Sequence, residues 1–249
     1  MKICLLYNKI IKKMKKYGSD KMEYEIKGGA FPMVICKLEK GETMKNEGGG
    51  SMALMTSKIK MESSTGGGGI LKGLGRALAG DSIFLNFFTA EEDDQEIGFA
   101  NSFPGKIIPI ELDGNKTIIA QKSAYLASEK DVDINMHFRK KLGTGLFGGE
   151  GFILQKFSGF GIVFLEIDGE VIEYDLKEGE KLVIDQGHLA AMDESVDFDI
   201  QRVKGAKNIM FGGEGLFLST LTGPGKVWVQ TMPLSNFIEA IIPYIPRND

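Results

Sequence analysis

Cysteine, histidine and tryptophan are scarce in this chain of 249 residues, which contains two cysteines, two histidines and one tryptophan. Cys4 and Cys36 lie far apart and do not form a CxxC pair, so a disulfide framework is excluded. We interpret them as free thiols in a reducing compartment, which predicts a cytoplasmic location. Two histidines are too few for a His-rich metal site, and we therefore predict no metal and no cofactor.

Long apolar runs and a basic surface are also missing. No apolar stretch approaches the roughly 18 residues that a membrane-spanning helix requires. The chain carries 30 basic and 34 acidic residues, but residues 1–21 hold seven lysines and a single acid, Asp20. Residues 22–249 are therefore acidic, with 23 basic and 33 acidic side chains. Because phosphate contacts need clustered Lys and Arg, this composition does not favour nucleic-acid binding.

Residues 1–21 differ in composition from everything that follows. The composition changes at Met22, and the apolar stretch Ile3–Tyr7 is too short for a signal peptide. We expect residues 1–21 to be a non-essential N-terminal extension. Two alternatives stay open, because the apolar residues between the lysines fit one face of a helix: a packing helix or an anchor at a membrane surface.

Glycine and internal repetition are what the sequence has in abundance, with 33 glycines in all. Residues 105–136 align with residues 169–200 without a gap, at an offset of 64. Residues 33–55 form a third copy of this segment. The motif FGGEG recurs at the same offset of 64, within residues 147–154 and 211–218. The chain therefore contains one sequence unit in three versions.

The repeats place the unit boundaries. After the extension at residues 1–21, the three units cover residues 22–100, 101–164 and 165–249. The first unit is longer because it contains a glycine-rich insertion, Gly66–Gly80.

Within a unit the local signals are those of strands and tight turns. Apolar and polar residues alternate in Val171–Leu176 and in Val196–Ile200, and turn pairs such as Asp113-Gly114 and Asp168-Gly169 interrupt the runs. A β unit of 64 residues is only marginally stable alone, whereas three units that share an interface bury the missing surface. We therefore predict an all-β fold of three tandem β-sandwich units around a pseudo-threefold axis.

The segments at residues 66–92, 98–112, 121–128 and 145–159 resemble the altered-inheritance-of-mitochondria family, which in bacteria is a domain of unknown function. The resemblance rests on a Gly-rich–Arg–Ala-Gly–acid–Phe-Leu pattern and on the repeated FGGEG, and it covers about residues 22–235. It implies a fold similar to the tryptophan RNA-binding attenuation protein, a short double-stranded β-helix that occurs three times in the chain. It implies no established enzymatic activity.

One acidic position recurs in all three units, as Asp81, Glu150 and Glu214. Three carboxylates around a pseudo-threefold axis can bind a hard cation such as Ca²⁺. The alternative is that each is a turn carboxylate, which accepts hydrogen bonds from the backbone N–H groups of neighbouring glycines. We favour the turn role and keep these three acids as the candidate binding position.

No catalytic residue is predicted. The repeat aligns His188 with Ala124 and Gly50, so no symmetric site contains this histidine, and the sequence has no nucleophile elbow. We expect His188 to be solvated or hydrogen-bonded. Residues 66–80 lack a GxxxxGK[ST] motif and do not favour a nucleotide site. Their apolar spacing predicts a short helix that fills the core, contacts a partner or touches a membrane.

These observations favour a soluble, non-enzymatic binding or scaffold protein whose partner is an unidentified protein or a small ligand. Two alternatives stay open: a small-molecule-processing enzyme of cupin-like β-helix type, and an RNA-binding protein by analogy of fold. Because three units in one chain can replace a homotrimer, we expect a monomer or a weak homo-oligomer. The apolar tail Phe237–Ile245 predicts a short helix that closes the last unit, or a docking surface.

Overall fold

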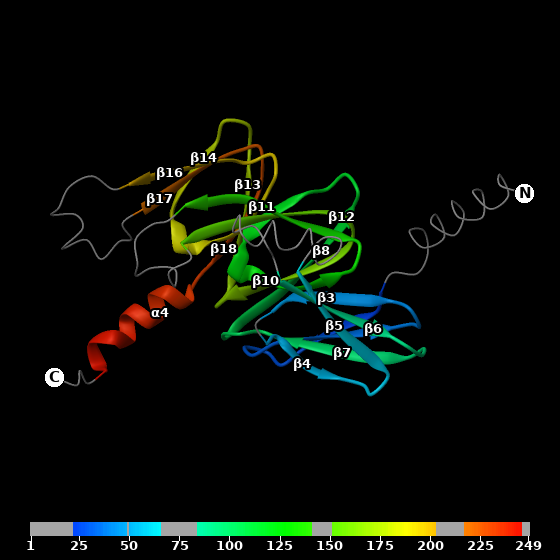
Figure 1. The fold of residues 1–249 in the computed structure, drawn as a ribbon. Helices are drawn as coiled ribbons and strands as arrows, with labels where there is room; N and C mark the ends of the chain where they lie inside the picture. Colours follow the sequence, from blue (N-terminus) through cyan, green and yellow to red (C-terminus); the bar gives the residue numbers. More distant parts are fainter. Residues whose placement is uncertain (1–21, 49, 66–83, 141–150, 203–216, 246–249) are drawn as a thin grey trace, which may run out of the picture.

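In the computed structural model, the described part of the chain comprises residues 22–48, 50–65, 84–140, 151–202 and 217–245. Antiparallel strands dominate it, and α4 (Leu234–Ile241) is the single α-helix within these ranges (Figure 1). The all-β prediction is confirmed. The extension at residues 1–21 and the insertion at residues 66–80 lie outside the described residues, so both predictions stay open.

The first group of strands, blue to blue-green in Figure 1, contributes to two sheets. Its members are β1 (Tyr24–Lys27), β2 (Met33–Leu38), β3 (Thr43–Glu47), β4 (Met52–Met55), β5 (Ile59–Thr65), β6 (Phe84–Ala90) and β7 (Gln95–Ala100). One sheet has the order β1-β2-β7-β4. The other contains β3, β6 and β5 as neighbours and continues into the middle of the molecule.

The middle group is organised around one long strand. Its members are β8 (Gly105–Asp113), β9 (Ile118–Gln121), the 3-10 helix η1 (Lys122–Ala124), β10 (Tyr125–Glu129), β11 (Val132–Lys140) and β12 (Phe152–Asp168). The first half of β12 pairs with β9 and β11, and the second half pairs with β8 and β10. Gly159 and Gly161, with φ of +93° and +119°, allow the strand to bend between its two halves.

The last group lies at the other end of the molecule (Figure 1). Its members are β13 (Val171–Leu176), β14 (Lys181–Asp185), the 3-10 helix η2 (Gln186–His188), β15 (Leu189–Asp193), β16 (Asp197–Arg202), β17 (Phe217–Thr222) and β18 (Gly225–Gln230). β18 pairs with β13 and β15, and β17 pairs with β14 and β16. α4 and the 3-10 helix η3 (Ile242–Tyr244) follow this group.

Neighbouring groups are joined edge to edge. β10 of the middle group pairs with β3 of the first group, where Ser128 lies opposite Lys45. β15 of the last group pairs with β9 of the middle group, where Ala191 lies opposite Ala120. Hydrogen-bonded sheet therefore continues across both joints.

The strands form where side chains alternate between core and solvent. In β2, Val34, Cys36 and Leu38 are all buried, whereas the residues between them are partly or fully exposed. Among the described residues the core comprises three clusters, and each cluster takes members from two adjacent groups. Phe164 of β12, for example, packs in the first cluster, and Trp228 of β18 packs in the second. The joints are thus apolar as well as hydrogen-bonded.

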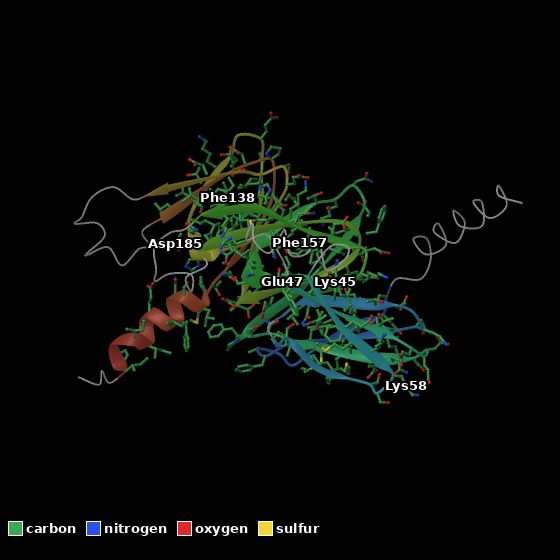
Figure 2. The ribbon with its side chains drawn as sticks, in the orientation of Figure 1. Lys45, Glu47, Lys58, Phe138, Phe157 and Asp185 are labelled. Atoms are coloured by element: carbon green, nitrogen blue, oxygen red, sulfur yellow. The ribbon has the colours of Figure 1, made fainter. Side chains whose placement is uncertain are left out.

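A buried lysine reinforces the joint between β3 and β10. Lys45 is 6% exposed, and its Nζ donates hydrogen bonds to the backbone oxygens of Val132 and, at 3.1 Å, Lys130. Burial lowers the pKa of Lys45 below its usual value. Figure 2 shows Lys45 inside the molecule and Lys58 at its outer edge.

We expect Lys45→Met to lower the free energy of unfolding by about 1–2 kcal/mol, because the buried carbonyl oxygen of Val132 and the partly buried carbonyl oxygen of Lys130 lose their donor. Urea denaturation measures the change. Lys58→Met is the matched control, since Lys58 forms an exposed ion pair with Glu92, and it should change stability by less than about 0.5 kcal/mol. Equal losses in the two variants would contradict this account of Lys45.

Candidate functional site

A cleft of about 660 Å³ lies where the three groups of strands and α4 come together. Its walls come from the end of β3, the β9–η1–β10 segment, both ends of β12, η2 and the cleft-facing side of α4. Its volume is within the range typical of small-molecule sites.

The end of β12 supplies an acidic wall. The Glu166 carboxylate accepts hydrogen bonds from the backbone N–H of Ser102 at 2.6 Å and from the Ser102 hydroxyl at 3.1 Å. Burial raises the pKa of Glu166 to about 7, and it also raises the pKa of Asp168. An Asp168 carboxylate oxygen accepts a hydrogen bond from the Leu234 N–H at 2.8 Å, at the start of α4. This acceptor satisfies one backbone donor that a helix leaves free at its N-terminus.

Amide side chains hold the neighbouring backbone in place. Gln121 donates from Nε2 to the Gln186 carbonyl at 3.2 Å, and Gln230 donates from Nε2 to the Gly187 carbonyl at 2.8 Å. The Gln230 Oε1 accepts a hydrogen bond from the Asp168 N–H. These contacts tie η2 to the ends of β9 and β18, so this part of the cleft is built on anchored backbone.

Glu47, at the end of β3, brings a further carboxylate to the cleft. It accepts a hydrogen bond from Nε2 of Gln155 on β12. Gln155 is 2% exposed, and its Oε1 has no hydrogen-bond donor. A buried acceptor without a donor is costly, and Gln155 itself is not among the residues that line the cleft.

An apolar wall comes from α4 and η3. Leu234, Ile238 and Ile242 follow one another at intervals of four residues, which places them along one side of the helix, and all three line the cleft. They remain 42%, 48% and 48% exposed. Phe237 packs against Phe103 with ring centroids 5.1 Å apart and so helps to hold the helix on the body. The cleft thus joins an acidic wall to an incompletely covered apolar wall.

His188 contacts α4 and is not among the residues that line the cleft. Its Nδ1 lies 2.8 Å from the Gln230 carbonyl oxygen, and its Nε2 lies 3.2 Å from Nδ2 of Asn236 on α4. The prediction of a hydrogen-bonded histidine is confirmed.

Comparison with known proteins gives the family. The family model described as mitochondrial biogenesis AIM24 matches residues 24–232. The chain belongs to this family. An uncharacterized protein of Streptococcus pyogenes serotype M6 is 27% identical over 244 residues, which cover 95% of this chain and 96% of that protein. The crystal structure of another Streptococcus pyogenes protein matches with a TM-score of 0.74 at 24% identity, over 90% of this chain and all of that one. This second likeness supports the fold alone.

The repeated acids of the AIM24-family chain, Asp81, Glu150 and Glu214, all lie outside the described residues. Their role as a binding position therefore stays a prediction. In the described ranges, no three His, Cys, Asp or Glu side chains gather closely enough to hold a metal ion. Within the same ranges, no helix has the length and apolar character to cross a membrane.

Sequence reasoning missed the acidic wall of the AIM24-family chain. The signal was present, because Glu166 and Asp168 alternate with the buried Leu165 and Ile167 near the end of an otherwise apolar strand. The partners of the wall were not readable from the sequence, since Ser102 and Leu234 are each more than 60 residues away from the acid that they contact. The apolar tail was recognised, and the structure confirms that part of it is helical.

Proposed function

We propose that this protein is a non-enzymatic binding protein, and that its cleft takes a small ligand with an aliphatic body. One observation carries the proposal: Leu234, Ile238 and Ile242 line a cleft of about 660 Å³ and yet remain between 42% and 48% exposed. Exposed apolar side chains that converge on a concave site are typical of ligand-binding clefts. An aliphatic ligand would cover this wall and remove it from water.

The state of the nucleophilic and basic side chains supports binding over catalysis. Both ring nitrogens of His188 lie within hydrogen-bonding distance of structural partners. Cys36 is buried in β2, where burial raises the pKa of its thiol to about 12 and keeps it protonated. Both oxygens of the Glu166 carboxylate accept hydrogen bonds from Ser102. His188 and Glu166 are thus engaged in structural contacts, and the Cys36 thiol lies in the core away from the cleft.

Octanol tests the proposal as a neutral aliphatic probe, with isothermal titration calorimetry of the full chain as the measurement. We expect octanol to bind, and Ile238→Glu to weaken its binding at least about tenfold, because a charge replaces apolar contact surface. Ile172→Glu is the matched control, since Ile172 is 46% exposed on β13 and does not line the cleft. Failure of octanol to bind, or equal binding by both variants, would refute the proposal.

The proposal also covers how the three repeated units are arranged. The three units, at residues 22–100, 101–164 and 165–249, would be copies of one fold around a pseudo-threefold axis, as in the attenuation protein. The recurring strand pairings support it. β7 pairs with β2 and β4, the second half of β12 pairs with β8 and β10, and β18 pairs with β13 and β15. β6, the first half of β12, and β17 repeat the scheme with the remaining strands.

Equivalent positions in this pairing scheme carry polar residues, which also supports three related units. Glu47, Gln121 and Asp185 end the strands β3, β9 and β14, and Glu47 and Gln121 both line the cleft. The residues Asn86, Gln155 and Ser219 occupy matching positions one residue further along the partner strands, and all three are buried. A cleft at the meeting point of related units fits a single chain that acts as a monomer. Its cytoplasmic location stays a prediction.

A further inference from the structure

We propose that β4 of one chain pairs with β14 of a second copy of the chain, so that the protein associates with itself through two sheet edges. This inference goes beyond the proposed function and does not depend on the ligand of the cleft. It follows from the two joints inside the chain, from two edges that lack such a joint, and from the apolar side chains that both edges expose.

The two joints inside the chain are built in the same way. Between the first and middle groups, Ser128 of β10 lies opposite Lys45 of β3. Between the middle and last groups, Met192 of β15 lies opposite Ile119 of β9. Both pairings are antiparallel, and each of these four residues is at most 6% exposed. The chain therefore makes one kind of buried strand contact twice.

The pairing scheme also identifies the residues of a third joint of this kind. On β4 the equivalent of Ser128 is Met55, because each is the second paired residue after the bulge that both strands contain. On β14 the equivalent of Lys45 is Val183, because each is the third residue of its strand and pairs with the matching strand, β6 or β17. A third joint would thus place Met55 opposite Val183.

This third joint is absent from the part of the chain that the structure describes. β4 pairs with β7 alone and ends its sheet, and β14 pairs with β17 alone and ends its own sheet. β4 belongs to the first group and β14 to the last, and Figure 1 shows them towards the lower and upper edges of the molecule. Because each chain offers one edge of each kind, a second copy can supply the strand that each edge lacks.

Both edges expose the apolar side chains that the joint would cover. Met55 is 39% exposed and Val183 is 57% exposed, whereas their equivalents in the two existing joints are buried. Leu54, beside Met55, is a further 41% exposed, and β4 contains no charged residue. Proteins usually protect free sheet edges with charges, proline or a covering segment, so two unprotected apolar edges of matching register indicate an interface.

The short length of the strands sets the strength of this contact. β4 has four residues and β14 has five, so one joint buries less than the roughly 1,200–2,000 Å² of a stable interface. We therefore expect weak association, with single chains at low concentration. Each copy keeps its own cleft, so the joint links chains that can each bind ligand alone.

Sedimentation velocity of the full chain between about 5 and 500 µM tests the pairing. We expect the mass to rise above that of one chain as the concentration increases. Met55→Glu and Val183→Glu should each weaken the association at least about tenfold, because a charge replaces apolar surface at the joint. Both variants should melt at the temperature of the parent protein, since both side chains are exposed. Met61→Glu is the matched control, because Met61 is 45% exposed on β5, an edge strand outside the joint.

An equimolar mixture of the Met55→Glu and Val183→Glu proteins decides which edges meet. The first protein retains an unchanged β14 and the second an unchanged β4, so the mixture should form a 1:1 dimer although neither protein associates alone. A parent chain that stays monomeric at every concentration, or a mixture of folded variants that does not associate, would overturn the proposal. Loss of association in only one variant would mean that an edge pairs with its own counterpart, which would overturn it as well.

Discussion

Gly105→Ala is expected to destabilise the protein by at least about 3 kcal/mol, which would be the largest effect of any single change considered for this fold. A Cβ at Gly105 would lie 1.8 Å from the carbonyl oxygen of Ile167 and 3.1 Å from the backbone nitrogen of Gly169. Both atoms belong to backbone, so no side chain can rotate away, and β8 would have to separate from β12. Gly105 also donates its N–H to the Ala30 carbonyl at 2.8 Å, so the displacement would extend to the first group of strands.

Chemical denaturation and thermal melting of the Gly105→Ala variant measure this loss. Gly187→Ala provides the matched control, because the nearest atoms to its added Cβ lie 3.4 Å away and belong to the side chains of Asp185 and Ser235. We expect the control to remain within about 1 kcal/mol of the parent protein. A Gly105→Ala protein as stable as this control would show that β8 and β12 do not pack as closely as described.

Glu166→Gln is expected to stabilise the protein by about 2–3 kcal/mol at pH 8 and to have little effect at pH 5. Burial raises the pKa of Glu166 from 4.5 in the unfolded chain to about 7 in the folded protein. The folded protein therefore holds this proton more tightly, and the resulting stability is fully present below pH 4.5. It is lost as the pH rises towards and through 7, because the buried carboxylate must then ionise. A neutral amide avoids that loss and still offers an oxygen to the Ser102 N–H.

Melting temperatures across pH 5 to 8 measure the effect of Glu166→Gln. Glu170→Gln serves as the control, since Glu170 forms an exposed ion pair with Lys106 and should change stability by less than about 0.5 kcal/mol at every pH. A stability difference between Glu166→Gln and the parent protein that does not vary with pH would mean that Glu166 is not a buried titrating group.

The sequence was sufficient for the fold class because strand signals are local. The alternation in Val171–Leu176 marked β13, the alternation in Val196–Ile200 marked most of β16, and the turn at Asp113 was correctly placed between strands. There, the Asp113 carboxylate accepts hydrogen bonds from the N–H groups of Asn115 and Lys116, which is the local chemistry that the residue type predicts.

The cleft could not be predicted in the same way, because tertiary contacts make it. In the sequence Glu166 is only an acid near the end of a strand, because its contact with Ser102 forms through the tertiary structure. The apolar spacing of Leu234, Ile238 and Ile242 predicts a helix, but it does not predict that these side chains line a cleft. The sequence also drew attention to His188, whose ring nitrogens have structural partners. Sequence patterns thus indicated strands and a helix, whereas burial and charge at the site depend on distant segments.

The long strand β12 has a consequence for how the molecule opens. Bends at residues 91–94 separate β6 from β7 and bends at residues 223–224 separate β17 from β18, whereas β12 is one unbroken strand from Phe152 to Asp168. A fluctuation that detaches either half of β12 acts on the other half through the same backbone. Amide protons along the middle group should therefore exchange with solvent as one cooperative unit, while the end groups have breaks between strands at which local opening can stop.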